Sequence, residues 1–290
     1  MKNSKIFNSG VHTFFIINTL LMIVPFFLVL AISVSDEGDI ARFGYSLIPR
    51  TFDFEAYSIL FQNVGVLVRA VIWTVFVALV SPLASLAITA MGGYTFTRPN
   101  FKFKGVITGF YVVMMFLGAG MMAGYIVNAT WFHLVNNPLI YFIPGFSFWN
   151  AVLFRTNFNN VPEEIIEAAS IDGASEMKIL VKIMLPMSKA IFGMLYFMAV
   201  VGIWNSYNTS LIYFDEQHSQ YWTIQYILQR SIQNAQYLAD AYAMAGISSD
   251  LPLNTMKYCV CVISMVPLFI VFPYVQKYFA KGMAVGSVKG

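Results

Sequence analysis

The chain has 290 residues, of which 58% are hydrophobic and only 11% charged, and its formal net charge is +3. A soluble domain carries about 25% charged residues, so this composition excludes an ordinary soluble protein and predicts one that takes lipid as its solvent. The small net charge gives no support to nucleic-acid binding. Because no long polar stretch leaves room for a second domain, we expect a single transmembrane domain over residues 1–290.

Six apolar segments reach or approach the length that crosses a bilayer, which is about 20 residues for a helix. They cover residues 11–34, 66–94, 106–127, 139–154, 191–214 and 258–279. The fourth is short and contains Pro144-Gly145. The first is longer than the core of a signal peptide and no small-x-small cleavage site closes it, so we expect a retained span.

Basic residues are distributed unevenly among the connections between these segments. Loops on the cytoplasmic side of membrane proteins collect Lys and Arg. With six spans and both termini inside, 12 of the 17 basic residues are cytoplasmic: Lys2, Lys5, Arg98, Lys102, Lys104, Arg155, Lys178, Lys182, Lys189, Lys277, Lys281 and Lys289. The remaining five are Arg42, Arg50, Arg69, Arg230 and Lys257. This bias predicts a multi-pass protein with cytoplasmic N- and C-termini.

Ionisable side chains are nearly absent from the six segments, which argues against proton- or sodium-coupled transport. Cys259 and Cys261 would point to different faces of one helix, so neither a disulfide nor a metal pair is expected. The three histidines show no ligand spacing, and the spans contain no paired acids. We therefore expect no metal site and no catalytic residues, and the protein is not expected to be an enzyme.

The most polar connection lies between the fourth and fifth segments, at residues 160–186. Pro162 suits the first turn of a helix, and Glu163 complements the positive end of that helix. Gly173 favours the left-handed conformation that ends many helices. Pro186 interrupts the hydrogen bonds of a second helix. The connection is therefore predicted to form two short helices joined by a tight turn.

Within this connection the sequence reads Glu167-Ala168-Ala169, then Gly173, then Ile183-x-Leu185-Pro186. The spacing resembles the EAA loop of bacterial ABC importer permeases. The longer string Glu-Ala-Ala-x-Ile-Asp-Gly-Ala is similar to the carbohydrate-uptake branch, which includes the maltose permeases. Trp204-Asn205 and the C-terminal residues 281–290 are similar to permeases for complex oligosaccharides, including pectin- and alginate-type fragments. Ala190 departs from the pattern, because many relatives have a second proline there.

The resemblance implies an all-α integral membrane fold of the type I ABC importer permeases, with six transmembrane helices and a cytoplasmic coupling helix. It implies that ATPase coupling rests on Glu163, Glu167, Ala168, Ala169, Asp172, Gly173, Ile183, Leu185 and Pro186. It also implies these partners: a second homologous permease, a dimeric ATPase, an extracytoplasmic sugar-binding protein, membrane lipid, and a sugar or oligosaccharide substrate. This chain would bind no cofactor, since ATP and Mg²⁺ would belong to the ATPase. The location would be the bacterial cytoplasmic membrane.

A sugar site needs planar aromatic rings beside amides or hydroxyls. The fifth segment supplies this mixture, and Trp204, Asn205, Tyr207 and Asn208 are the candidates for the substrate pathway. The alternative is that these polar groups hold helices together through hydrogen bonds between helices. From the residues alone, both interpretations stay open.

Three alternatives to a sugar importer permease are a permease for another solute, a secondary transporter and an intramembrane enzyme. An ABC permease for a non-sugar solute would share the same motif. A secondary transporter would show repeated halves and often intramembrane charges, and an intramembrane enzyme would need a catalytic set within the spans; the sequence offers neither. It also lacks a P-loop, so ATP hydrolysis must come from another subunit.

Overall fold

The computed structural model describes residues 2–62, 64–99, 101–117, 120–245 and 252–287. Helices account for nearly all regular structure in this part of the chain, which holds one isolated bridge, between Ser35 and Phe52, and no strand. The α-helices are α1 (Lys2–Ser33), α2 (Glu37–Phe43), α3 (Glu55–Gln62), α4 (Val64–Thr97), α5 (Lys104–Leu117), α6 (Gly120–Ile126), α7 (Phe148–Phe158), α8 (Glu163–Ile171), α9 (Glu176–Ile179), α10 (Leu185–Met187), α11 (Lys189–Trp204), α12 (Asn208–Tyr213), α13 (Ile224–Ala245) and α14 (Leu253–Ser287). Two π-helical segments, η1 (Val127–Trp131) and η3 (Leu180–Met184), and two 3-10 segments, η2 (Pro138–Phe142) and η4 (Glu216–Tyr221), connect them.

Three of the described helices are long and apolar enough to cross a membrane: Gly10–Ser33 in α1, Val64–Thr97 and Leu253–Ile270 in α14. A fourth candidate is the pair Glu176–Met187 and Lys189–Trp204, whose axes differ by 84°. The first two helices contain Pro25 and Pro82, which long membrane helices tolerate.

The predicted spans 11–34, 66–94 and 258–279 overlap single long helices. The other three predicted spans fall on divided elements. Residues 106–127 cover α5 and α6, residues 139–154 cover η2 and the start of α7, and residues 191–214 cover α11 and α12. Six complete spans with these boundaries therefore stay a prediction.

The chain divides into two compact units, and the first comprises residues 1–68 and 227–270. In this unit α1 packs against the first part of α14, with the Phe26 and Phe269 rings 5.8 Å apart. The Cys259 thiol donates to the Ser33 carbonyl at 3.2 Å, and the Tyr57 hydroxyl donates to the Ser33 hydroxyl at 3.0 Å. These contacts fix the C-terminal end of α1.

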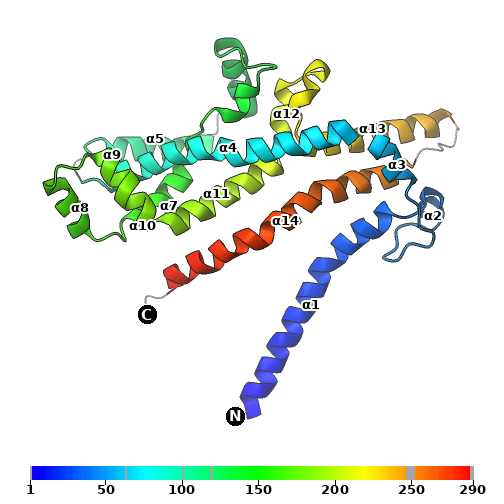
Figure 1. Cartoon of the computed structure of the whole chain (residues 1–290), viewed down its shortest axis with the longest axis horizontal. Helices are drawn as coiled ribbons and strands as arrows, with labels where there is room; N and C mark the ends of the chain where they lie inside the picture. Colours follow the sequence, from blue (N-terminus) through cyan, green and yellow to red (C-terminus); the bar gives the residue numbers. More distant parts are fainter. Residues whose placement is uncertain (1, 63, 100, 118–119, 246–251, 288–290) are drawn as a thin grey trace. The chain divides into compact units, whose positions relative to one another are not determined.

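The second unit comprises residues 69–226 and 271–290. Its core is formed where α4, α7, α9, η3 and α11 meet (Figure 1), by Leu86, Ala90, Tyr94, Phe154, Phe158, Val161, Ile179, Leu180, Met184 and Leu195. Gly93 permits the close approach of α4 and α7, since a Cβ there would lie 2.7 Å from the Cβ of Phe154 and 2.8 Å from the carbonyl oxygen of Ala151. Small residues commonly occupy such contacts in membranes.

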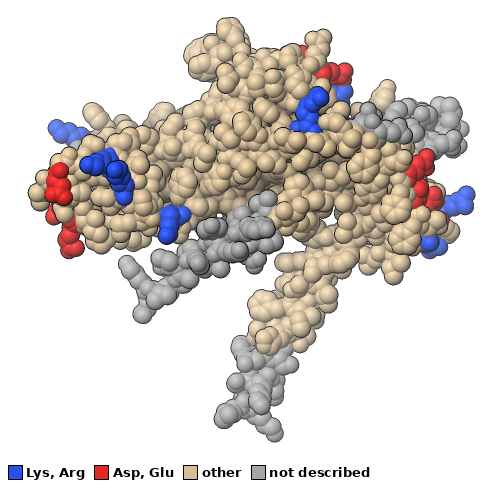
Figure 2. All heavy atoms as spheres, in the orientation of Figure 1, with Lys and Arg blue, Asp and Glu red and all other residues tan. Residues whose placement is uncertain are grey.

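The outer surface of α4 is apolar along much of its length. Large side chains on it are exposed, including Ile72, Phe76, Leu79 and Leu83. Figure 2 shows red and blue atoms at the end that carries α8 and α9, while the surface along the middle of α4, between that end and α12, is almost free of charge. A surface of this kind requires lipid or another apolar subunit around it.

Candidate functional site

The segment 160–186 folds as a hairpin of two helical limbs, as its sequence predicts. The first limb is α8, with Glu163 in its first turn. Its N-cap is Pro162, so this proline stands one position before the first helical turn that the sequence suggested for it. At the other end the Asp172 amide donates to the Ala168 carbonyl at 3.0 Å, and Gly173 has φ +74°. Only glycine adopts this left-handed conformation at little cost, so Gly173 sets the reversal of the chain.

One side of α8 faces the core. Ile166 and Ala169 are spaced three residues apart and pack against the core cluster of the second unit. This spacing puts both side chains on one face of the helix. The first limb is therefore a packed element rather than a loosely tethered loop.

The other side of α8 is exposed and partly apolar. Ile165 is 40% exposed and Ile171 is 86% exposed. The exposed residues on this limb that the motif singles out are Glu163, Glu167, Ala168, Asp172 and Gly173. A large exposed isoleucine beside small alanines and acids is a surface suited to a second protein.

The second limb runs through α9, η3 and α10. Ser175 begins it and accepts a hydrogen bond from the Lys178 amide at 3.4 Å. Ile183 and Leu185 of the motif are partly buried against the core, while Pro186 is exposed. The motif residues thus separate into an outer set on α8 and an inner set that fixes the hairpin to the second unit.

The regular α-helical hydrogen bonds of the second limb are interrupted before Pro186, and the limb continues one residue past it, to Met187. Pro186 lies inside α10, which follows the π-helical segment η3. In η3 the backbone bonds reach five residues back, as from the Leu185 amide to the Leu180 carbonyl. This wider turn accommodates a residue that has no N–H to donate.

The chain bends two residues after Pro186, at Ser188. The axes before and after it, in Glu176–Met187 and Lys189–Trp204, differ by 84°. Ser188 is 2% exposed, and its hydroxyl has no hydrogen-bond partner among the described residues. A buried hydroxyl without a partner is energetically unfavourable, so this conformation of the bend carries a cost at Ser188.

An ion pair links the hairpin to the end of α4. The Arg98 Nη2 lies 2.7 Å from the Glu176 Oε2, and the Tyr94 hydroxyl donates to the same carboxylate. The Arg98 guanidinium also lies 4.4 Å from the centre of the Tyr94 ring. The sequence gives no signal for this group, because Arg98 and Glu176 are 78 residues apart and neither belongs to the motif.

The four predicted pathway residues lie where the helix is interrupted between α11 and α12. Trp204 is the last residue of α11 and is 5% exposed, whereas Asn205 is exposed. The Asn205 amide group donates to the Val201 carbonyl of its own helix at 3.0 Å. Tyr207 is half-buried and Asn208 is exposed at the start of α12. Their role in a pathway remains a prediction.

A buried hydroxyl network lies beside this interruption. The Ser210 hydroxyl is 2.8 Å from the Tyr141 hydroxyl and 3.1 Å from that of Thr223. The Thr74 hydroxyl of α4 accepts from the Ile224 amide at 2.9 Å, where α13 begins. These contacts connect α4, η2, α12 and the start of α13, and those of Tyr141 and Thr74 join residues far apart in the sequence, which hydropathy cannot detect.

A second polar group joins the segments after η1 and α12. The side-chain amide of Asn136 donates to the Asp215 carboxylate at 2.8 Å, and the backbone amide of Asp215 donates to the side-chain oxygen of Asn136 at 3.1 Å. The His218 ring lies 2.7 Å from the same carboxylate. The hydrogen bond from His218, with that from Asn136, lowers the pKa of Asp215 below its usual value. Asp215 therefore stays ionised at neutral pH.

No cluster of three or more His, Cys, Asp or Glu residues suited to a metal ion occurs in the described part of the chain. The candidate site comprises the hairpin with its exposed apolar face, the bend at Ser188 and the interruption between α11 and α12.

Comparison with protein families gives a match over residues 8–285 to the family described as "Binding-protein-dependent transport system inner membrane component". The chain belongs to this family. It is therefore a permease subunit of an ABC importer, with the all-α type I permease fold, and such subunits are not enzymes. A permease of this family is a membrane component that works with an ATPase and a substrate-binding protein.

Relatives of this permease include two Bacillus subtilis proteins. The polygalacturonan/rhamnogalacturonan transport system permease protein YtcP is 27% identical over 291 residues, which cover 100% of each chain. Protein LplC is 29% identical over 272 residues, covering 92% of this chain and 90% of LplC. The permease thus aligns with both over nearly their whole length.

A solved structure shares the fold of the permease. It is a bacterial ABC transporter involved in the import of the acidic polysaccharide alginate, with a TM-score of 0.77 and 22% identity, covering 96% of this chain and 98% of that one. At this identity the likeness establishes the fold alone.

Proposed function

We propose that this permease is one of two homologous subunits that form the pathway of a sugar or oligosaccharide importer. In this proposal a dimeric ATPase binds ATP and Mg²⁺ and drives transport through the hairpin. An extracytoplasmic binding protein delivers the sugar. The unequal distribution of basic residues supports a location of both termini and the hairpin on the cytoplasmic side.

The observation that carries the proposal is that α8 is packed on one side and exposed on the other. Ile166 and Ala169 fix one side to the core, while Ile171 on the same helix is 86% exposed. An element that is packed on one side and open on the other moves as a rigid body when a partner binds the open side. The ATPase is the partner that must exert such a force, since the chain has no nucleotide-binding loop of its own.

The ion pair between Arg98 and Glu176 would transmit this movement directly to α4. In addition, the second limb continues past Ser188 into α11, which ends at Trp204. A displacement of the hairpin would therefore change the position of the interruption that precedes α12. We assign Asn205, Tyr207 and Asn208 to the pathway on this basis, because polar groups at such an interruption usually line a cavity.

The substrate class rests on the relatives. The names of the relatives include transport of polygalacturonan/rhamnogalacturonan, arabinooligosaccharides and maltodextrin. A sugar oligomer is consistent with the aromatic and amide groups near residue 204. A non-sugar solute would be the alternative substrate for the same permease architecture.

The test is transport by the complete importer in proteoliposomes, with the second permease, the ATPase and the binding protein. Labelled oligogalacturonides and maltodextrins, with an amino acid and a peptide as non-sugar controls, should separate the substrate classes. We expect ATP-dependent uptake of one sugar series only. Uptake of the amino acid or peptide with no sugar uptake would contradict the sugar assignment.

A further inference from the structure

An exposed apolar segment follows α2 in the first unit, over residues 43–54. Six of its large apolar side chains are more than half exposed: Phe43, Tyr45, Leu47, Ile48, Phe52 and Phe54. Ile48 is the most open of them, at 78%. So many exposed apolar side chains on one short segment indicate a surface that lipid or another protein covers.

The backbone fixes this segment at the end of a membrane-length helix. Ser35 and Phe52 form a bridge directly after α1. The Asp36 amide donates to the Thr51 carbonyl at 3.2 Å, and the Asp53 amide donates to the Val34 carbonyl at 3.0 Å. Because the apolar stretch of α1 ends at Ser33, the segment lies at the level where hydrocarbon gives way to headgroups.

The exposed apolar surface also continues along α1. Large side chains in its membrane-length part are exposed within the chain, including Ile17, Leu21 and Phe27. The segment 43–54 therefore extends a surface that the helix presents to the bilayer or to apolar neighbours within it. Aromatic residues are enriched where such a surface reaches the headgroups.

Two cations near the segment, Arg42 and Arg50, are exposed. The carboxylates of Asp36 and Asp53 accept backbone amides, at 2.9 and 3.0 Å, and that of Glu37 holds the start of α14. Arg50 lies over the Phe43 ring at 3.9 Å, and no carboxylate pairs with it in the part of the chain that the structure describes.

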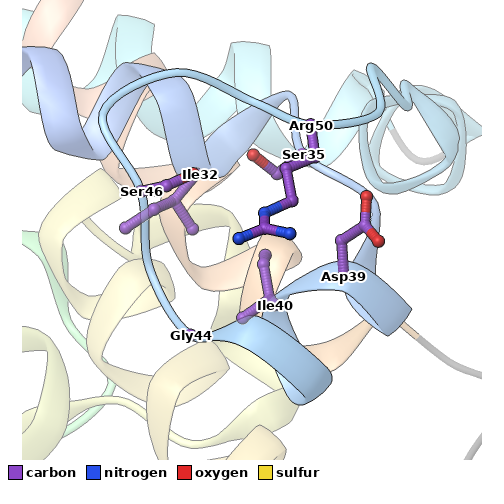
Figure 3. A pocket seen from close by; sticks show the side chains of 7 residues that line it. All are labelled: Ile32, Ser35, Asp39, Ile40, Gly44, Ser46 and Arg50. Atoms are coloured by element: carbon purple, nitrogen blue, oxygen red, sulfur yellow. The ribbon is translucent and has the colours of Figure 1, made fainter.

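Arg50 points into a shallow pocket of the same unit (Figure 3). The pocket is lined by Ile32, Ser35, Asp39, Ile40, Gly44 and Ser46. Arg50 as a whole residue is exposed, so a small movement of its side chain out of the pocket would bring the guanidinium to an acceptor outside the chain. A phosphate at the membrane surface is such an acceptor, since guanidinium binds phosphate with paired hydrogen bonds.

We propose that residues 43–54 are a membrane-interface anchor that docks on phospholipid. The rings of Phe43, Phe52 and Phe54 lie at the boundary of acyl chains and headgroups, and Arg50 binds a headgroup phosphate. The anchor fixes the depth of the C-terminal end of α1 and, through Glu37, that of the start of α14. This role is independent of the sugar and of the ATPase.

The depth of a nitroxide label tests the proposal in the complete importer, reconstituted in phosphatidylethanolamine/phosphatidylglycerol liposomes. The label is placed by Ile48→Cys in a Cys261→Ala background, since Cys259 is fully buried. Ile17→Cys on α1 is the control for the acyl region, and Lys102→Cys, at an exposed position after α4, is the control for water. Collision with oxygen, which partitions into lipid, is compared with collision with a water-soluble nickel chelate.

The Ile48 label should collide with oxygen more than the Lys102 label and with the nickel chelate more than the Ile17 label. Arg50→Gln should raise the collision rate of the Ile48 label with the nickel chelate about twofold, because the headgroup contact is lost. An Ile48 label that matches the Lys102 control would overturn the anchor. A label shielded from both reagents would show that protein covers the segment, which also overturns it. An unchanged rate in Arg50→Gln would eliminate the phosphate contact.

Discussion

Glu176 at the start of α9 and Arg98 directly after α4 form an ion pair with a separation of 2.7 Å, so the membrane-length helix and the hairpin are joined by side chains. Arg98→Ala should reduce the number of substrate molecules transported per ATP hydrolysed several-fold, because α4 no longer follows the hairpin. The pair is partly exposed, with side chains 23% and 68% open, so it should contribute no more than about 1 kcal/mol to the free energy of unfolding. Uptake and hydrolysis measured together test this prediction. Lys102→Ala, which removes a nearby exposed charge, should leave the ratio unchanged.

Gly173 connects the two limbs with φ +74°, a conformation that costs other residues about 1–2 kcal/mol. Gly173→Ala should therefore misplace α8 and lower substrate-stimulated ATP hydrolysis, while the rest of the fold remains intact. Gly193→Ala is the matched control, since Gly193 lies in α11 with open space around its Cβ position. Equal hydrolysis in both variants would mean that the turn is not required for coupling.

The buried hydroxyl of Ser188 lies at the 84° bend. Removing an unpaired buried hydroxyl stabilises the conformation that contains it, by up to about 1–3 kcal/mol. We therefore expect Ser188→Ala to raise the melting temperature and to slow transport, since it favours one conformation of the bend. Differential scanning fluorimetry and uptake rates check the two effects. A lower melting temperature would indicate that the hydroxyl has a partner in the resting state.

Glu37 holds the first residues of α14 by four hydrogen bonds. Its carboxylate accepts from the amides and side chains of Asn254 and Thr255 at 2.7 to 3.1 Å. Glu37→Ala should destabilise the first unit by about 1–3 kcal/mol, because these donors lose a charged acceptor. Denaturation in nanodiscs measures the change. The control Glu55→Ala alters an exposed acid in α3 and should have an effect of less than about 0.5 kcal/mol.

Trp204 and Asn205 should respond differently to alanine. Trp204 is buried, so Trp204→Ala is expected to cost about 3–5 kcal/mol of stability through the cavity that it leaves. Asn205 is exposed and bonds only within its own helix turn, so Asn205→Ala should keep the fold and reduce uptake. Assembly, followed by size-exclusion chromatography, separates the two cases. Failure of Asn205→Ala to assemble would favour a structural role for this amide.

Hydropathy located α1, α4 and α14 because each is a long apolar helix, which needs no tertiary information to recognise. It could not locate the divisions within residues 106–127, 139–154 and 191–214, where short helices are stabilised by packing against neighbours. A continuous apolar run does not reveal an interruption such as the one after Trp204.

The hairpin was predictable because its signals are local. Gly173 determines a turn through its own conformation, and the motif spacing places Ile183 and Leu185 on the second limb. The contacts of Arg98 and Ser188 were not predictable, since one depends on a residue 78 positions away and the other on an 84° change of axis. The π-helical turn before Pro186 was not predictable either, because sequence rules for proline predict an interruption of the hydrogen bonds and not the wider turn that accommodates it.

The central claim is that the exposed face of α8 binds the ATPase. A photo-reactive benzoylphenylalanine in place of Ile171, which is 86% exposed, tests it in the assembled importer. Thr156, exposed on α7, is the control position. The account predicts that the label at residue 171 cross-links to the ATPase subunit and the label at residue 156 does not. Cross-linking from residue 171 to lipid or to the second permease, with none to the ATPase, would contradict it.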